Sequence, residues 1–151
     1  MKLTAPMMLL LALVLQTPSA GANSIVVMRS AHDVNETINR LETALRAKGV
    51  TIFARIDHAA NARGVDVSLR PVQLLIFGNP KLGSPLLASN PMVGLDLPMK
   101  ALAWEDADGK VWLGYTAAAT IAKRYRIENR AAVIDKMTGA LKNFGAAATR
   151  P

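Results

Sequence analysis

The order of apolar and polar residues along the first half of the chain predicts strands and a helix in alternation. Residues 24–28 are mostly β-branched and predict a first strand. Residues 33–49 open with Asp-x-x-Glu, carry apolar side chains at helical spacing and end in Gly, which predicts a helix. Alternating apolar residues at 50–56 predict a second strand, and the continuous apolar run at 72–77 predicts the central strand of a sheet.

The second half of the chain is predicted to form a short helix, a β-hairpin and two further helices. These elements are expected, in order, at residues 85–90, 100–105, 110–116, 117–125 and 130–144. The Asp-Gly at the centre of the hairpin is a turn signal, because Gly readily accepts a positive φ. Trp104 and Trp112 stand on the two strands of the hairpin, near enough in register to pair, either in the core or on a dimer surface.

Together these elements predict an α+β fold with a single compact domain over residues 23–144. The expected architecture is a largely antiparallel sheet of four to five strands, with helices packed on one face. Gly145 is expected to end the last helix, and the Ala-rich residues 145–151 are expected to form a flexible C-terminal tail.

Residues 1–22 have the pattern of a secretory signal peptide. Lys2 supplies a positive start, Met7–Leu15 is apolar, and the small residues up to Ala22 suit cleavage after that position. The apolar run is well short of the ~20 residues that a membrane span needs, and no later run is long enough. We therefore expect a mature protein that is periplasmic or secreted and has no transmembrane segment. An uncleaved anchor is the alternative.

Composition narrows the chemistry that the chain can perform. It has no Cys, which excludes thiolate catalysis and Cys-ligated metals. The net charge of +7 favours anionic partners, but the basic residues are spread along the chain without interleaved aromatic residues, so we expect no nucleic-acid binding. The densest basic stretch, residues 123–130, is interpreted as a solvated helix surface, with anionic lipid headgroups or a polyanion as the alternative.

The candidate site is built on His58, which follows Asp57 at the end of a predicted strand. Imidazole titrates near neutral pH and binds metals, and Asp57 or Asp96 could fix its tautomer. Arg70 offers a guanidinium to a small anionic ligand, and Asn79 lies in a Gly-Asn-Pro turn. We predict a ligand pocket where the loop after His58, this turn and the Asp96 loop meet. In the structural alternative, His58 bonds a loop carbonyl and Arg70 forms an ion pair with a nearby Asp.

The same residues suit acid/base catalysis as a second interpretation. His58 would then be the acid/base of a small hydrolase or isomerase, with Asp96 orienting it and Arg70 holding the substrate. A metal site has weak support because the chain has only two histidines, and His58 is the weak candidate ligand. No cofactor is predicted. Haem would need His58 as its axial ligand, and the sequence has no Cys-x-x-Cys-His attachment motif.

Several motifs occur together in an order that is typical of one family. They lie at residues 56–62, 69–71, 76–83, 94–98 and 111–115. On these motifs the chain resembles the domain of unknown function 302 family over nearly all of its expected mature length. The resemblance implies a compact α+β fold with an antiparallel sheet and a tendency to form homodimers, and it implies no established activity.

The sequence departs from the family pattern in one respect. Many relatives carry an Arg-His pair near the end of the penultimate helix, whereas residues 123–126 here read Lys-Arg-Tyr-Arg. Any site built on that second histidine is therefore absent or altered. The preferred interpretation is an exported, non-catalytic domain that binds a small ligand or another protein. A small acid/base enzyme that uses His58 and a purely structural dimeric domain without ligand are the alternatives.

Overall fold

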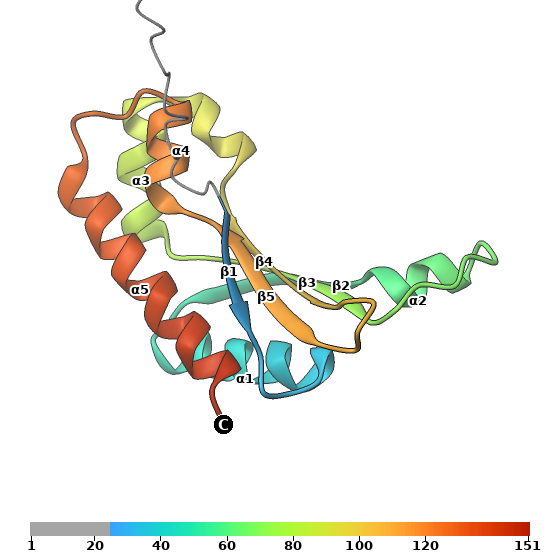
Figure 1. Cartoon of the computed structure of the whole chain (residues 1–151). Helices are drawn as coiled ribbons and strands as arrows, with labels where there is room; N and C mark the ends of the chain where they lie inside the picture. Colours follow the sequence, from blue (N-terminus) through green and yellow to red (C-terminus); the bar gives the residue numbers. More distant parts are fainter. Residues whose placement is uncertain (1–24) are drawn as a thin grey trace, which may run out of the picture.

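Five strands form one antiparallel sheet in the order β1-β5-β4-β3-β2 (Figure 1). The structure, a computed structural model, describes residues 25–151, so the predicted signal peptide at 1–22 lies outside the described residues. The strands are β1 (Ile25–Arg29), β2 (Thr51–Asp57), β3 (Val72–Gly78), β4 (Met99–Glu105) and β5 (Val111–Thr116). The antiparallel sheet and the β4-β5 hairpin confirm the predicted fold class.

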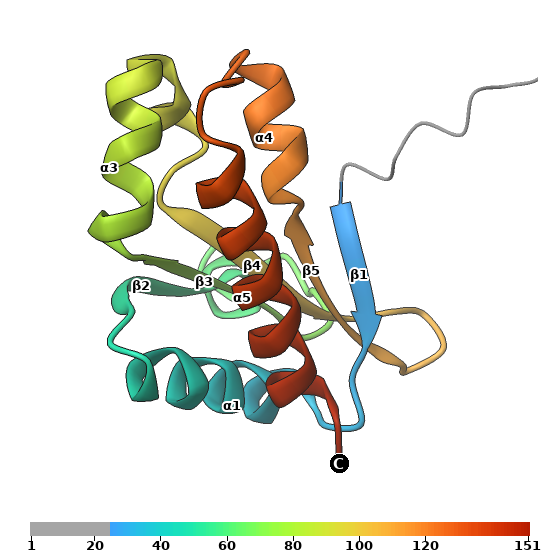
Figure 2. The same cartoon turned by 90° about the vertical axis from the view of Figure 1, so that its left-hand side faces the viewer.

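Two helices, α1 and α5, pack across one face of this sheet (Figure 2). The helical segments are α1 (Val34–Ala47), α2 (His58–Arg63), α3 (Pro80–Ser89), the 3-10 helix η1 (Pro91–Leu95), α4 (Ala118–Arg124) and α5 (Ala131–Thr149). Within the described residues, no helix combines the length and the apolar character that crossing a membrane requires.

The core lies between this face of the sheet and the two helices. α1 begins where the carboxylate of Asp33 accepts a hydrogen bond from Glu36 N at 2.7 Å. It ends before Gly49, whose φ of +68° lies in the left-handed region that favours glycine. Both ends agree with the prediction. The apolar stripe of α1, with Ile38 and Leu45 fully buried, packs on the inward-facing residues of the sheet.

The opposite face of the sheet is open and largely apolar. Its outward-facing side chains include Ile25, Val27, Ile56, Val72, Leu74, Ile76, Leu102, Trp104 and Trp112, together with the polar Arg29, Lys100 and Thr116. Trp104 pairs directly with Trp112 across β4 and β5, as predicted, and its ring covers Gly114, where a Cβ would lie 3.0 Å from the ring. The open face of an antiparallel sheet usually carries polar residues, so an apolar open face marks a surface suited to a partner.

An arm extends from the end of β2 away from the rest of the molecule (Figure 1). We call residues 58–71 the arm; they comprise α2 and the loop that leads into β3. From the sequence, only a loop was expected after His58. The arm opens with a helix because the carboxylate of Asp57 accepts from Ala60 N at 2.8 Å. Beyond α2, the side chains of Val65 and Val67 are exposed.

Two expectations for the middle of the chain are wrong. The central strand is β4, and the apolar run at 72–77 forms β3, which lies between β4 and the edge strand β2. The helix expected at 85–90 begins earlier, at Pro80. Asn79 Oδ1 accepts a hydrogen bond from Lys81 N at 2.9 Å. Pro80 occupies the first helical position, where a backbone N–H has no partner within the helix, so proline loses no hydrogen bond there.

The last helix continues past the glycine at which it was expected to end. α5 runs through Gly145 to Thr149, and Ala148 and Thr149 are buried, so most of the expected tail is helical. Gly145 serves close packing instead, because a Cβ at this position would lie 2.6 Å from Met28 Sδ on β1. A glycine inside a helix therefore lets α5 approach the sheet.

Candidate functional site

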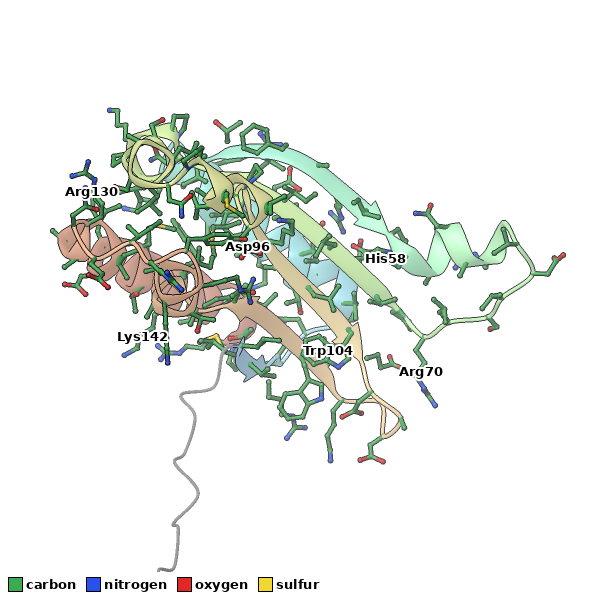
Figure 3. The ribbon with its side chains drawn as sticks, turned by 90° about the horizontal axis from the view of Figure 1, so that it is seen from above. His58, Arg70, Asp96, Trp104, Arg130 and Lys142 are labelled. Atoms are coloured by element: carbon green, nitrogen blue, oxygen red, sulfur yellow. The ribbon has the colours of Figure 1, made fainter. Side chains whose placement is uncertain are left out.

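The polar residues predicted to form one site lie at opposite ends of the sheet. His58 and Arg70 belong to the arm, beside the first residues of β3. Asn79 and Asp96 lie beyond the last residues of β3, a strand of seven residues or roughly 20 Å. Figure 3 shows His58 and Arg70 well apart from Asp96. These residues therefore do not come together in one site.

The carboxylate of Asp57 is engaged by the protein backbone and by a neighbouring strand. One oxygen accepts from Ala60 N at 2.8 Å, and the other accepts from Gln73 Nε2 at 3.4 Å. His58 is the first residue of α2 and is half-buried. Asp57 thus acts as a helix cap, and a ligand role for Asp57 or His58 stays a prediction.

Arg70 forms an ion pair at the surface. Its Nη1 lies 3.2 Å from Glu105 Oε1, and both side chains are partly exposed. The partner is a glutamate on β4 and not one of the aspartates that the sequence suggested. Exposed pairs of this kind add little stability, so the contact orients Arg70 along the sheet more than it holds the fold together.

Asp96 contacts α4 and does not contact His58. Its Oδ2 accepts from Arg124 Nη1 at 2.5 Å, and the carboxylate raises the pKa of Arg124. The pKa of Tyr125 is also raised, first by desolvation and then by its contact with Asp96. Asp96 is therefore part of a local Asp-Arg-Tyr cluster, and the His58–Asp96 pair required for acid/base catalysis is not formed.

An apolar pocket of about 320 Å³ lies at the Asn79 end of the sheet. Its lining residues come from α3, α5, the ends of α1 and β3, the first half of β2 with the residue before it, and the loop that leads into β4. Figure 2 shows how these elements are arranged. Its inner wall consists of buried side chains, namely Leu45, Phe77, Met99, Met137 and Leu141. Its rim consists of exposed or half-buried lining residues, namely Phe53, Asn79, Pro80, Ser84, Leu87 and Gly94.

The backbone shapes the rim of this pocket. The register of β2 against β3 shifts between Ile52 and Ala54, so Phe53 is the extra residue of a bulge, a feature that redirects a side chain. Its ring lies over Gly78, where a Cβ would be 3.3 Å from the ring. The missing side chain of Gly78 therefore leaves room for the ring at the entrance.

The pocket offers few polar groups to a ligand. Asn79 and Ser84 are the two polar side chains among its lining residues, all of which belong to the described part of the chain, and no lining side chain is ionisable. The Oδ1 atom of Asn79 already caps α3. A pocket with an apolar wall and one or two polar groups suits binding of an apolar molecule, whereas acid/base catalysis needs a titratable group at the reacting atom.

The predicted pocket is partly matched by this one. The Gly-Asn-Pro turn at 78–80 and the loop around Asp96 both contribute lining residues, the latter through Leu97 and Pro98. The loop after His58 does not contribute. Sequence reasoning placed the start of α3 five residues too late, although the Asn-Pro pair at 79–80 is a helix-start signal that would have predicted it. Among residues 25–151, no three His, Asp or Glu side chains form a group that could hold a metal ion.

Fold and pocket together define the chain as a small α+β domain with an apolar cavity at one end of its sheet. The chain belongs to the DUF302 family, since the model described as "Domain of unknown function DUF302" matches residues 26–144. A solved DUF302 protein from Bacillus stearothermophilus has the same fold, with a TM-score of 0.76 at 19% identity over 84% of this chain and 99% of that one. The family resemblance seen in the sequence is confirmed.

Curated relatives contain a similar segment within longer chains. Fluoride-specific ion channel FluC 1 of Brucella suis biovar 1 (strain 1330) is 42% identical over 105 residues, which is 70% of this chain and 41% of that protein. Fluoride-specific ion channel FluC 2 of Brucella melitensis biotype 1 is 42% identical over 105 residues, which is 39% of its length. This chain thus spans about two fifths of the relatives that it matches.

Proposed function

We propose that this domain binds a small, largely apolar molecule in the pocket and does so without catalysis. The observation that carries the proposal is the cavity of about 320 Å³, a size within the range of ligand sites, with an apolar wall and no ionisable lining residue. Burial of apolar surface would supply the binding energy, and Asn79 and Ser84 at the rim would orient a polar group of the ligand.

This proposal changes the ligand class expected from the sequence. A small anionic ligand was expected because Arg70 could bind a carboxylate. Arg70 instead contacts Glu105, at the end of the sheet away from the pocket. With no cation among the lining residues, the pocket would leave a buried anion unpaired, which is costly.

Titration with N-phenyl-1-naphthylamine, a neutral dye that fluoresces in apolar sites, tests the proposal. Wild-type protein should bind the dye saturably. Ala140→Phe places a ring into the pocket from α5 and should weaken binding by at least about tenfold, equivalent to about 1.4 kcal/mol. Ala132→Phe adds the same ring at an exposed position of α5 outside the pocket and should bind like the wild type.

Equal dye binding by the two Phe variants would place the dye elsewhere and contradict the proposal. Circular dichroism should show that both variants are folded. Should Ala140→Phe lose its fold, Ser84→Phe offers a second test, because Ser84 is an exposed rim residue where a ring narrows the entrance without entering the core.

The predicted signal peptide underlies a further part of the proposal, that the protein is exported. Cleavage after Ala22 would leave a mature chain that begins at Asn23. Fractionation of cells that express the full chain, with N-terminal sequencing of the product, should find this shortened protein outside the cytoplasm. An intact Met1 in the cytoplasmic fraction contradicts export.

The open face of the sheet supports a homodimer. Its exposed or half-buried apolar residues form a patch of the kind that usually marks an interface. Leu102 lies near the centre of this face, so Leu102→Glu should convert a dimer to a monomer in sedimentation experiments. Lys136→Glu, at an exposed position of α5 on the other side of the sheet, is the control and should remain dimeric. A wild-type protein that is monomeric at every concentration tested contradicts this part.

Similarity to the FluC relatives favours a second candidate function, as an accessory to a membrane ion channel. The specific observation is that a segment 42% identical to this chain forms part of proteins named fluoride-specific ion channels. Deletion of the gene should then lower the fluoride concentration at which the host stops growing, and expression of the full chain should restore it. Unchanged growth in fluoride argues against this candidate.

A further inference from the structure

The rim of the pocket continues outward into exposed apolar side chains. Phe53 and Leu87 line the rim and are 56% and 40% exposed. Met92 and Leu95 lie on η1, the 3-10 helix that also supplies the rim residue Gly94, and they are 62% and 75% exposed. A pocket whose ligand arrives through water does not need apolar side chains that project from its entrance into the solvent. Exposed apolar residues around an apolar cavity instead suit entry from an apolar phase.

The segments that line the pocket are also basic. Within residues 45–53, 77–87, 90–100 and 133–145 there are six basic residues and two acidic ones. The basic residues are Arg46, Lys48, Lys81, Lys100, Lys136 and Lys142. Arg46 is paired with Glu42 and Asp96 with Arg124, so the five lysines are the basic residues of these segments that form no ion pair within the described residues. This surplus of positive charge complements an anionic bilayer surface, which attracts basic residues next to inserted apolar side chains.

We propose that the domain docks on an anionic lipid bilayer through Phe53, Leu87, Met92 and Leu95 and that the pocket takes up one hydrocarbon chain of a lipid. This inference rests on the proposed function, since it names the ligand of the same pocket. The volume of about 320 Å³ is at the lower end of the range for small-molecule sites, which fits one chain and not a whole lipid. The polar headgroup would remain outside, near Asn79 and Ser84 at the rim.

Flotation with lipid vesicles tests the docking step. The purified protein should float with vesicles of phosphatidylcholine mixed with phosphatidylglycerol, and should float much less with phosphatidylcholine alone or in high salt. The double variant Met92→Glu, Leu95→Glu should lower the affinity for the mixed vesicles by at least about tenfold, because it removes the apolar contact and adds repulsion. Dye binding in the pocket should be unchanged, because neither side chain lines it.

The arm offers a matched control for the double variant. Val65→Glu with Val67→Glu introduces the same charges at two exposed apolar residues, which lie on the arm and not at the pocket rim. This control should float like the wild type. Equal loss of flotation in both double variants would reflect net charge alone and overturn the docking surface.

Mass spectrometry of the protein separated from the vesicles tests uptake. Wild-type protein should carry phosphatidylglycerol or phosphatidylcholine, and Ala140→Phe should carry at least about tenfold less while still floating. Dye binding without vesicle binding overturns this inference and leaves the proposed function intact. Recovery of free fatty acid without vesicle binding also overturns it. Absence of dye binding contradicts the proposed function and the inference together.

Discussion

The two ends of the sheet differ in the kind of residue that forms their main contacts. At the arm end, polar residues that stand out in the sequence form single contacts within the protein: Asp57 caps α2, and Arg70 pairs with Glu105. At the pocket end, apolar residues from α1, α3, α5, β3 and the loop before β4 enclose a cavity. The polar residues that stand out most in the sequence therefore stabilise the fold through helix caps and ion pairs. The cavity is formed by apolar residues that do not stand out in the sequence.

The physical reason for this contrast is the range of the interactions. A polar side chain needs one suitable partner within reach, in its own helix turn or on an adjacent element, because a buried polar group without a partner is costly. A cavity depends on how whole elements pack, so its lining is drawn from segments far apart in the sequence. In this chain, the unusual polar residues are better guides to helix caps and ion pairs than to the pocket.

The largest expected difference between the two ends is in core stability. Phe77 is 4% exposed, lies on β3 and forms part of the inner wall of the pocket. Phe77→Ala should lower the free energy of unfolding by about 3–5 kcal/mol, measured by urea denaturation. Leu69→Ala in the arm, where the side chain is exposed, should change it by less than about 0.5 kcal/mol. Similar losses in both variants would mean that the arm is packed in solution.

The two helix caps provide the next comparison, because each end of the sheet has one. Asp57→Ala and Asn79→Ala each remove a side-chain oxygen that accepts from the first turn of a helix, and each should cost about 1 kcal/mol in urea unfolding. Only Asn79→Ala should also weaken dye binding, since Asn79 lines the pocket. If Asp57→Ala alone bound the dye more weakly, the dye site would lie at the arm end of the sheet and not in the pocket.

A smaller, pH-dependent effect is expected at the tip of the β4-β5 hairpin. The indole N–H of Trp112 donates to Asp106 at 2.7 Å, and the backbone N–H of Lys110 donates to it at 2.9 Å, so the pKa of Asp106 is lowered from 3.8. A lowered pKa in the folded state stabilises the fold above about pH 4, and this contribution is lost as the pH falls through the folded-state value.

Asp106→Asn should accordingly have a lower melting temperature than the wild type at neutral pH. In acid, where Asp106 of the wild type is protonated, the melting temperatures of the two proteins should converge. The matched control is Asp108→Asn, because the Asp108 carboxylate contacts only the exposed Lys110 Nζ, at 3.5 Å. It should melt like the wild type at both pH values. A constant difference between Asp106→Asn and the wild type at all pH values would contradict the pKa argument.

Local sequence signals predicted much of the fold. The cap at Asp33, the glycine at position 49 and the Asp-Gly turn of the hairpin fixed element boundaries correctly, because each acts on its own neighbours. Gly145 shows the limit of such signals. Glycine commonly ends a helix, but here it fits a close contact with Met28, a residue more than a hundred positions earlier, and no local pattern reveals that contact.

The candidate site was less predictable than the fold for the same reason. The turn at 78–80 and residues 97–98 of the Asp96 loop do line one pocket, since both segments lie at the same end of the sheet, whereas the ligand role given to Asn79 and Asp96 stays a prediction. His58 and Arg70 were grouped with them because the sequence does not say which end of a strand faces which loop. That grouping depends on the strand order β1-β5-β4-β3-β2, and the sequence had suggested β3 at the centre.

The smallest effect is expected for His58, the residue that the sequence singled out most strongly. Its neighbour Asp57 supplies the cap of α2, and Asp96 is paired with Arg124, so His58→Ala should change the free energy of unfolding by less than about 0.5 kcal/mol and leave dye binding unchanged. His32 is the matched control, because its Nε2 lies 2.8 Å from the carbonyl oxygen of Arg150 and His32→Ala should cost about 1 kcal/mol. If His58→Ala instead abolished binding while His32→Ala did not, the arm end would be the functional end after all, and the contrast between the two ends would be reversed.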